Sequence, residues 1–460
     1  MTQPNLILIL IDDLGWRDLR CYGSTFYQTP NLDRLCAQGL RFTDAYAACP
    51  VCSPTRASIL TGRYPARVGV TDWIGGHSRG KLLEVPYVDH LPLTEKSLAR
   101  TLREAGYATW HVGKWHLGED TSLIARHGFD VNVGGCGWGL PKNGYFSPWG
   151  IPTLADGPQG EYLTDRLTDE AIRLIRQNDG QPFFLNLWYY AVHTPIQAKA
   201  DKIVKYEAIA RELGLDEAET FRPGEYFPCE HKRDRRVMRR LLQSDATYAA
   251  MVESLDENIG RLLQALDEEG LTQDTAILFT SDNGGLATSE GSPTCNAPLA
   301  EGKGWMYEGG TREPLIVRWS GVTAPGGVCH TPVTSTDFYP TMLEMAGLDL
   351  LPEQHCDGVS LAPLLRGEGD LAREAIYWHY PHYGNQGGTP GSSIRCGEYK
   401  LIEFYEDRHR ELYHLGDDIA EEHDLSADEP GLTRDLGDAL AAWRDEVGAL
   451  IPQPNPGYTT

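Results

Sequence analysis

Short apolar runs alternate with helical patterns along the first two thirds of the chain. Helical spacing of apolar positions predicts helices at 93–105, 164–176 and 241–266. Between them, near-continuous apolar runs predict buried strands at 5–11, 107–112, 182–189, 275–280 and 313–319. Strands of this kind are typical of a mainly parallel sheet whose two faces are both covered. We therefore expect an α/β fold with a large, mainly parallel sheet flanked by helices.

The pattern changes after about residue 350. Short aromatic runs split by Gly and Pro predict a small antiparallel sheet, with strands at 375–380, 392–396, 399–405 and 411–415. A periodic stretch at 432–447 predicts a helix packed against this sheet. We predict a large α/β domain at residues 1–350 and a smaller C-terminal α+β subdomain at 351–460, with a boundary between Gly347 and Ala372.

Composition and charge narrow the possible partners. The formal net charge of -24 argues against a general nucleic-acid or anionic-membrane surface, because such partners need patches of Lys and Arg. An anionic substrate would need locally concentrated positive charge. Ten cysteines in 460 residues are too few for a disulfide scaffold and favour a reducing compartment.

The N-terminal apolar run bears on localisation. Residues 6–11 are too few to span a bilayer, and they begin too close to Met1 to follow a signal peptide. The chain as given is therefore expected in the cytoplasm. It would be periplasmic or secreted if a signal peptide had been removed from a longer chain.

The segment around Cys52 predicts a short helix with reactive chemistry at its start. Ser53 can cap this helix, Pro54 suits its first position, and Gly62 can supply the left-handed residue that ends it. Free amides and the positive end of the helix dipole would favour an anion beside Cys52. Arg56, one turn later, adds a fixed charge with a planar fork of donors.

Cys49 and Cys52 also form a C-x-x-C pair, which permits a redox dithiol or half of a zinc site. A zinc site would need a second pair of ligands at compatible spacing, and the other eight cysteines are scattered singly. A thiol-dependent redox protein therefore remains an alternative interpretation.

Oxygen-bearing side chains follow two of the predicted strands. Asp12 and Asp13 end the first strand, and Asp282 and Asn283 follow the strand that ends at Ser281. The carboxyl ends of parallel strands gather the sites of α/β enzymes. Four oxygen ligands without a nearby His or Cys set fit Ca²⁺ or Mg²⁺ better than zinc, and calcium tolerates an irregular mixture better. Taken alone, Asp12 and Asp13 are more typical of a solvated turn with a helix cap.

Basic side chains follow the same kind of strand end. Lys114 and His116 are two residues apart just past a strand, His193 follows the strand at 182–189, and Lys303 lies in a glycine-rich loop. Lysine can neutralise an oxygen of a charged ester, and histidine can move a proton near neutral pH. Each of these residues alone is typical of a solvated or structural position.

Five separated motifs carry a family resemblance. The segment C-S-P-T-R-A-S-I-L-T-G-R, which begins at Cys52, resembles the sulfatase signature C-x-P-S-R-x-x-x-L-T-G-R, with Thr55 in place of the usual serine. The segments D-D-L-G, G-K-W-H-L-G and S-D-N-G-G resemble further sulfatase motifs, and His193 and Lys303 occur in the family's order. The chain is similar to type I, formylglycine-dependent sulfatases of the alkaline phosphatase superfamily, most closely to carbohydrate and aryl sulfatases.

The resemblance implies a cofactor, a maturation partner and roles for these residues. A formylglycine-generating enzyme would oxidise Cys52 to formylglycine, and the family's Ca²⁺, or Mg²⁺, would be held by the hydrated aldehyde and by Asp12, Asp13, Asp282 and Asn283. The remaining catalytic residues would be Arg56, Lys114, His116, His193 and Lys303. One hydroxyl of the hydrate would lose its proton to Asp282 and attack sulfur. His193 or Lys303 would protonate the leaving alcohol, and His116 would take the second hydroxyl's proton, which expels sulfate.

The substrate is expected to be a sulfated carbohydrate. Trp73, His77, His379 and His382 are candidate sugar contacts, and packing between the two domains is the alternative explanation for them. Their segments look like those of carbohydrate sulfatases, which implies a galactose or N-acetylgalactosamine sulfate. The alternatives are a phosphonate or phosphate ester hydrolase of the same superfamily and a noncatalytic sugar-binding relative. No nucleic-acid or membrane partner is expected, and the sequence leaves the oligomeric state open.

Overall fold

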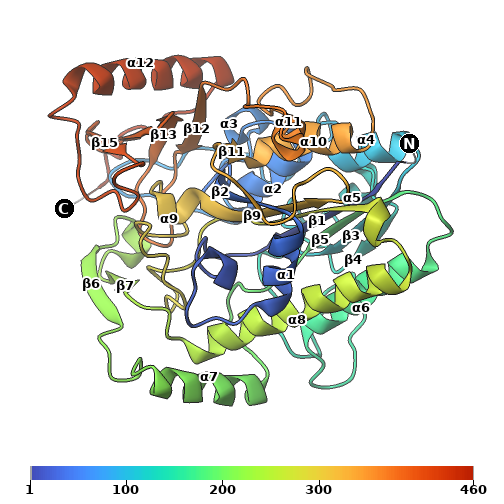
Figure 1. The fold of residues 1–460 in the computed structure, drawn as a ribbon. Helices are drawn as coiled ribbons and strands as arrows, with labels where there is room; N and C mark the ends of the chain where they lie inside the picture. Colours follow the sequence, from blue (N-terminus) through green and yellow to red (C-terminus); the bar gives the residue numbers. More distant parts are fainter. Residues whose placement is uncertain (1–2, 459–460) are drawn as a thin grey trace.

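A nine-stranded sheet forms the middle layer of the protein in the computed structural model, which describes residues 3–458 (Figure 1). The strand order is β10-β2-β9-β8-β1-β5-β3-β4, and β11 also pairs with β2. The strands are β1 (Asn5–Ile11), β2 (Leu40–Tyr46), β3 (Ala108–Gly113), β4 (Val131–Val133), β5 (Phe183–Trp188), β8 (Thr275–Ser281), β9 (Arg312–Trp319), β10 (Gly327–Cys329) and β11 (Val333–Thr334). Only β9 runs antiparallel to its neighbours β2 and β8, so the prediction of a mainly parallel sheet is confirmed.

Helices cover both faces of this sheet (Figure 1). One face carries α1 (Pro30–Gln38), α6 (Leu163–Gln177), α7 (Ala200–Glu212) and α8 (Ala246–Glu268). The other carries α2 (Cys52–Thr61), α3 (Pro65–Val68), α4 (Leu98–Glu104), α5 (Ser122–Arg126), α10 (Phe338–Met345) and α11 (Ala362–Arg366). Strand β1 shows why its sequence is apolar throughout: Ile7 and Ile9 enter the first core, and Leu6 and Leu8 enter the second.

Two predicted helices begin later than expected, because a capping side chain sets each start. Helix α4 begins at Leu98 after Ser97, whose hydroxyl accepts a hydrogen bond from the amide of Arg100. Helix α8 begins at Ala246 after Asp245, whose carboxylate accepts from two amides of the first turn. The predictions at 93 and 241 were therefore wrong by about one turn of helix. Within residues 3–458, no helix is long and apolar enough to cross a bilayer.

The predicted C-terminal sheet is present and antiparallel. It consists of β12 (Ala375–Tyr380), β13 (Gly391–Cys396), β14 (Tyr399–Phe404) and β15 (Arg410–His414). One face packs against α12 (Pro430–Val447) through Leu401 and Trp443, and the other packs through Trp378 against Tyr46 of the main sheet. The domain boundary at residue 350 stays a prediction.

A buried ionic network also joins the small sheet to the main domain. The carboxylate of Glu308, in α9 (Glu308–Thr311), pairs with Lys400 of β14 at 2.9 Å and with Arg312 of β9 at 2.7 Å. Arg312 and Arg395 of β13 both pair with Asp44 of β2 at 2.8 Å. The two sheets therefore meet through charged groups as well as through apolar packing.

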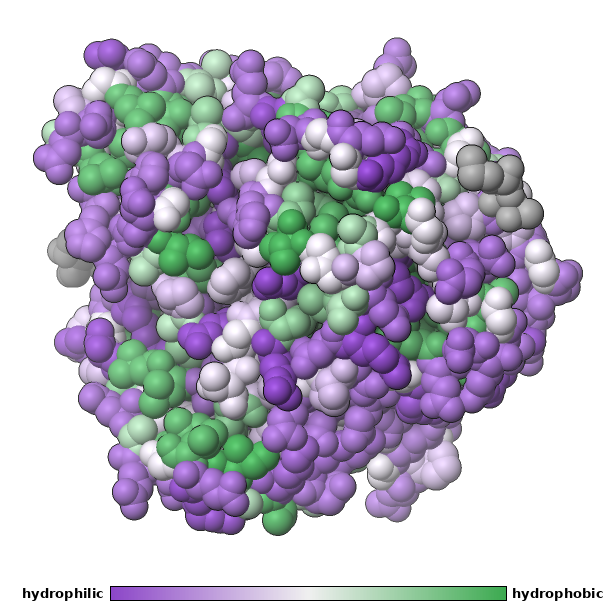
Figure 2. All heavy atoms as spheres, viewed as in Figure 1, coloured by the Kyte–Doolittle hydropathy of each residue, from purple (hydrophilic) through white to green (hydrophobic). Residues whose placement is uncertain are grey.

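The sequence did not predict a separate two-stranded hairpin. It is formed by β6 (Phe221–Tyr226) and β7 (Arg236–Arg240) and lies beside the C-terminal sheet (Figure 1). Short 3-10 turns complete the chain: η1 (Arg20–Tyr22), η2 (Glu230–Lys232), η3 (Thr272–Asp274) and η4 (Ser335–Asp337). Figure 2 shows a mainly hydrophilic surface on which hydrophobic side chains form separate groups.

Candidate active site

The candidate site lies at the carboxyl edge of the central strands. Strand β1 leads directly into Asp12 and Asp13, β8 into Asp282 and Asn283, and β3 into Lys114. His193 and Lys303 come from loops after β5 and β8. All seven of these residues, together with His116, are buried, as is Cys52 with an exposed fraction of 2%. The structure therefore brings the predicted metal ligands and catalytic residues together at one edge of the sheet, as their strand-end positions indicated.

Cys52 is the first residue of α2, and all ten residues of this helix are buried. The thiol Sγ of Cys52 lies 3.4 Å from Nδ1 of His116. Gly62 ends the helix with a φ of 68°, and a Cβ there would come within 2.4 Å of the Cβ of His355. Gly62 is therefore required both by its left-handed conformation and by this close contact.

The predicted cap of α2 was wrong. The helix begins at Cys52 itself, so Pro54 occupies the third helical position rather than the first, and Val51 precedes the helix without a side-chain cap. The Ser53 hydroxyl instead donates to the carbonyl of His116 at 2.9 Å and accepts from the amide of Ile74 at 3.1 Å. Ser53 thus connects the start of α2 to two neighbouring loops of the site.

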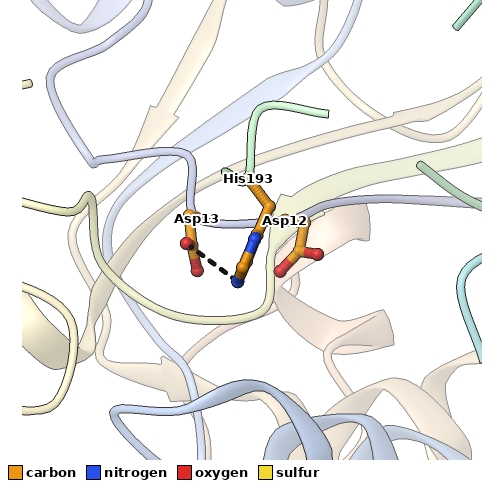
Figure 3. Close-up of side chains that lie close together, drawn as sticks. All are labelled: Asp12, Asp13 and His193. Carbon is orange, nitrogen blue, oxygen red and sulfur yellow. Dashed lines mark ion pairs between the residues drawn. The ribbon is translucent and has the colours of Figure 1, made fainter. Parts of the chain in front are cut away.

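The oxygen ligands fit a divalent cation. One ligand atom each from Asp12, Cys52 and Asp282 lie within 4.8 Å of one another, and so do ligand atoms from Asp12, Asp13 and His193 (Figure 3). Among the described residues, Oδ1 of Asp12 and Oδ1 of Asn283 are buried without a hydrogen-bond donor. Burial and the neighbouring charge of Asp282 raise the pKa of Asp12 to about 8. A cation held by these carboxylates would favour the charged form of Asp12.

Buried, positively charged side chains lie beside these carboxylates. Lys114 Nζ lies 2.6 Å from Oδ2 of Asp12, and Lys303 Nζ lies 2.7 Å from Oδ1 of Asp13. The guanidinium of Arg56 donates through Nε to Oδ2 of Asp282 at 2.9 Å, and its Nη2 lies 2.7 Å from the same oxygen as an ion pair. Arg56 therefore fixes the orientation of the carboxylate that the family resemblance assigns to proton removal.

The two histidines are held in their neutral form. Burial, reinforced by the charge of Lys303, lowers the pKa of His193 to about 3. Burial and Lys114 likewise lower the pKa of His116. His193 Nε2 lies 3.0 Å from Lys303 Nζ. It also lies 3.5 Å from Oδ2 of Asp13 (Figure 3). Neutral histidines can accept protons, and Lys303 can donate one.

Three of the four candidate sugar contacts, Trp73, His77 and His382, lie around Tyr87. His379 is buried within the C-terminal sheet, where Nδ1 contacts the hydroxyls of Ser392 and Tyr405. His382 is buried beside Thr71, 2.9 Å from its hydroxyl. These contacts favour the alternative explanation, packing between the two parts of the chain, for both histidines.

Trp73 and His77 lie on a segment that reaches the site. Trp73 is half-buried, and the exposed side chain of His77 pairs with Glu84 at 2.7 Å. Between them, the carbonyl of Ile74 lies 3.0 Å from Nε2 of His116. A role for Trp73 and His77 in sugar binding stays a prediction.

Sequence reasoning missed one buried carboxyl group. Glu313 of β9 has both carboxyl oxygens buried without a hydrogen-bond partner among residues 3–458. Burial and the nearby charges of Asp282 and Asp13 raise the pKa of Glu313 well above its usual value. Its signal was visible, because Glu313 is a charged residue at the start of a mainly apolar predicted strand.

The family assignment rests on nearly the whole chain. The sulfatase family model matches residues 4–348, and the model of the C-terminal part of N-sulphoglucosamine sulphohydrolase matches residues 301–444. The chain belongs to the sulfatase family. Sulfatases hydrolyse sulfate esters, so the predicted enzyme class is confirmed, and the redox-protein and noncatalytic interpretations are not supported.

Similar proteins are carbohydrate and aryl sulfatases in name and in fold. A sulfatase of Formosa agariphila is 33% identical in an alignment 523 positions long. This alignment covers 96% of this chain and 88% of that protein. The N-acetylgalactosamine-6-sulfatase of Canis lupus familiaris is 32% identical, covering 86% of this chain and 71% of that protein. The crystal structure of Ps i-CgsB in complex with k-i-k-neocarrahexaose superposes with a TM-score of 0.77 at 29% identity, covering 96% and 92% of the two chains. A phosphonate monoester hydrolase of Agrobacterium radiobacter, at 21% identity and a TM-score of 0.65, shares the fold alone.

Proposed function

We propose that this sulfatase removes O-sulfate from a carbohydrate of the galactose or N-acetylgalactosamine type, through a formylglycine formed from Cys52 and a bound divalent cation. The buried arrangement of Cys52, His116 and the carboxylates of Asp12 and Asp282 is the observation that carries this proposal. The sugar class is supported by the similar N-acetylgalactosamine-6-sulfatase and by the similar structure that was solved with a neocarrahexaose.

The cation would be held by Asp12, Asp13, Asp282, Asn283 and the modified side chain at position 52. The buried oxygens of Asp12 and Asn283 that lack donors are suited to this role. We propose Ca²⁺, because these five ligands are all oxygens and come from three separate segments of the chain, and Mg²⁺ demands a stricter geometry. When bound, the cation would acidify a hydroxyl at residue 52 and offset negative charge on the sulfate.

The chain's own residues supply the proton transfers. His116 Nδ1 is within reach of the side chain at position 52 and is neutral, so it can accept the proton whose loss releases sulfate. Lys114 pairs with Asp12 and Lys303 pairs with the neighbouring Asp13, and the two ammonium groups can balance the charge on the sulfate oxygens.

The leaving alcohol needs a proton donor. His193 Nε2 and Lys303 Nζ lie 3.0 Å apart at the sheet edge, so both are candidates for this role. Because burial and Lys303 hold His193 neutral, Lys303 is the member of this pair that carries a proton in the free enzyme. We therefore propose Lys303 as the donor, with His193 as the group that orients it.

The experiment begins with the mass of the peptide that contains Cys52, from protein co-produced with a formylglycine-generating enzyme and from protein produced without one. We expect the aldehyde or its hydrate only in the first sample. The matured protein is then assayed on sulfated galactose and N-acetylgalactosamine, and on matched phosphate and phosphonate monoesters. An unmodified thiol in both samples would contradict the role of Cys52. Faster cleavage of the phosphorus esters would contradict the substrate class.

A further inference from the structure

A strongly basic segment forms part of the hairpin beside the site, in a chain that is acidic overall. Residues 231–240 contain six Lys or Arg residues and one Asp, whereas the whole chain carries a formal charge of -24. This segment runs from η2 through β7. Such a local excess of positive charge is what an anionic ligand needs in order to approach an acidic protein.

Only the end of this segment is neutralised by carboxylates. Arg239 pairs with Glu225 and Glu301 at 2.8 and 2.6 Å, and Arg240 pairs with Asp245 at 3.4 Å. In the described part of the chain, no carboxylate lies within ion-pairing distance of the other four cations, which are Lys232, Arg233, Arg235 and Arg236. The positive charge of these four groups is therefore directed to solvent or to a ligand.

Three of these unpaired cations line a pocket of about 420 Å³. Lys232, Arg235 and Arg236 contribute positive charge to it, and the rings of Phe221 and Phe227 contribute apolar surface. Lys232 is fixed in place, because its Nζ donates to the carbonyl of Asn385 at 2.7 Å and lies over the ring of Phe227. Cations beside aromatic rings suit a ligand that combines an anionic group with the apolar face of a sugar ring.

One loop joins this pocket to the active site. Residues 284–302 connect Asn283 to Lys303, and Thr288, Ser289 and Glu290 of that loop line the pocket. The hairpin pairs with the loop through the amide of Met238, which donates to the carbonyl of Thr288 at 3.2 Å. Glu290 is the one acidic side chain that lines the pocket, so the lining keeps a net positive charge from its three cations.

We propose that the pocket binds a second sulfate of a sulfated oligosaccharide, while another sulfate of the same molecule lies at Cys52. This inference rests on the proposed function, and it makes the preferred substrate a saccharide with several anionic groups rather than a monosulfated sugar. Lys232, Arg235 and Arg236 would bind the second sulfate together. The loop between the two positions would set how many sugar units separate them.

The test compares two substrates in variants of the matured enzyme. Arg235→Gln and Arg236→Gln, alone and together, are assayed on a monosulfated N-acetylgalactosamine and on an oligosaccharide sulfated on successive sugars. The quantity compared is kcat/KM for the oligosaccharide divided by kcat/KM for the monosaccharide. We expect this ratio to fall about tenfold for each arginine replaced, because each replacement removes a charge-assisted hydrogen bond. Arg126→Gln is the matched control: Arg126 is exposed on α5, has no ion pair among the described residues, and should leave the ratio unchanged.

A binding measurement keeps the inference testable without turnover. Calorimetric titration of Cys52→Ala protein with the oligosaccharide should show weaker binding, and a smaller dependence on salt, when Arg235 and Arg236 are also replaced. Unchanged binding and an unchanged ratio would overturn the second subsite. Equal binding of poly-glutamate would overturn its assignment to a saccharide. If the matured enzyme cleaves aryl sulfates but no sugar sulfate, the proposed function fails, and the titration still decides whether the pocket binds the oligosaccharide.

Discussion

Replacing Glu308 by glutamine should destabilise the protein strongly, although Glu308 is outside the candidate site. Its carboxylate is fully buried and accepts hydrogen bonds from Tyr46 at 2.7 Å, Arg312 at 2.7 Å and Lys400 at 2.9 Å. Burial opposes its ionisation, but Lys400 and Arg312 lower the pKa of Glu308 to about 2, so it is charged at neutral pH. Glu308→Gln therefore removes the buried negative charge that Arg312 and Lys400 share, and each cation keeps one other carboxylate, Asp44 and Glu421 respectively.

Breaking a buried ion pair by removing one partner costs about 3–5 kcal/mol. For 460 residues the entropy of unfolding is roughly 1 kcal/mol per kelvin, which converts this loss into a fall in Tm of about 3–5 °C. Urea unfolding followed by circular dichroism measures the change as a lower midpoint at an unchanged slope.

Two further variants test whether the loss of stability comes from the buried ion pair or from any replacement of Glu by Gln. Glu446→Gln removes an exposed carboxylate that pairs with Arg67 at 3.0 Å, and it should cost less than about 1 kcal/mol. Lys400 keeps a second buried partner, Glu421, at 2.9 Å, so Glu308→Gln combined with Glu421→Gln should cost more than the sum of the two single variants, because the ammonium group then has no carboxylate. The reasoning fails if Glu308→Gln unfolds within about 1 kcal/mol of the natural protein, or if the double variant costs no more than that sum.

Three other predictions follow from the site and from the C-terminal sheet. Cys52→Ser should release one equivalent of alcohol and then stop, because a serine sulfate ester has no second hydroxyl to expel sulfate; repeated turnover by pure variant would contradict this. Treating the matured enzyme with EDTA should abolish hydrolysis, with recovery by Ca²⁺ greater than by Mg²⁺, as measured by initial rates. Burial opposes ionisation of Glu403, but Arg444 and Arg410 lower its pKa, so its stabilising effect is present above about pH 4.3 and is lost as the pH falls further. Glu403→Gln should therefore flatten the decline of the unfolding free energy between about pH 4.5 and 3, and an unchanged decline would refute this assignment.

Strands and strand ends were the features that the sequence predicted best. A fully buried strand such as β1 must be apolar at every position, and its end must deliver Asp12 and Asp13 to the sheet edge. The hairpin was missed because β7 is rich in arginine and β6 contains Pro223 and Gly224, so neither has an apolar pattern. Pattern alone also does not give the direction of a strand, and the antiparallel course of β9 was found only in the structure.

The sequence predicted the location of the candidate site better than it predicted the substrate contacts. Catalytic side chains follow strands, and the order of those strands along the sheet brings them together. His379 and His382 lie in an aromatic segment that resembled a sugar-binding surface, but the same aromatic character serves packing in the C-terminal sheet. Residue type does not distinguish sugar binding from packing, because an aromatic side chain in either role buries its ring and gives its polar atom a partner.

The burial of Cys52 bears on how the enzyme is made in a cell. The thiol is 2% exposed, it begins a helix with no exposed residue, and the C-terminal sheet packs beside it through Val51. A second enzyme cannot reach this sulfur in the folded molecule, so the proposed maturation of Cys52 requires a segment that is still extended. Folding and modification then compete in time. We expect that chains produced faster than they are modified become permanently inactive, and that slowing synthesis raises the active fraction more than any later treatment.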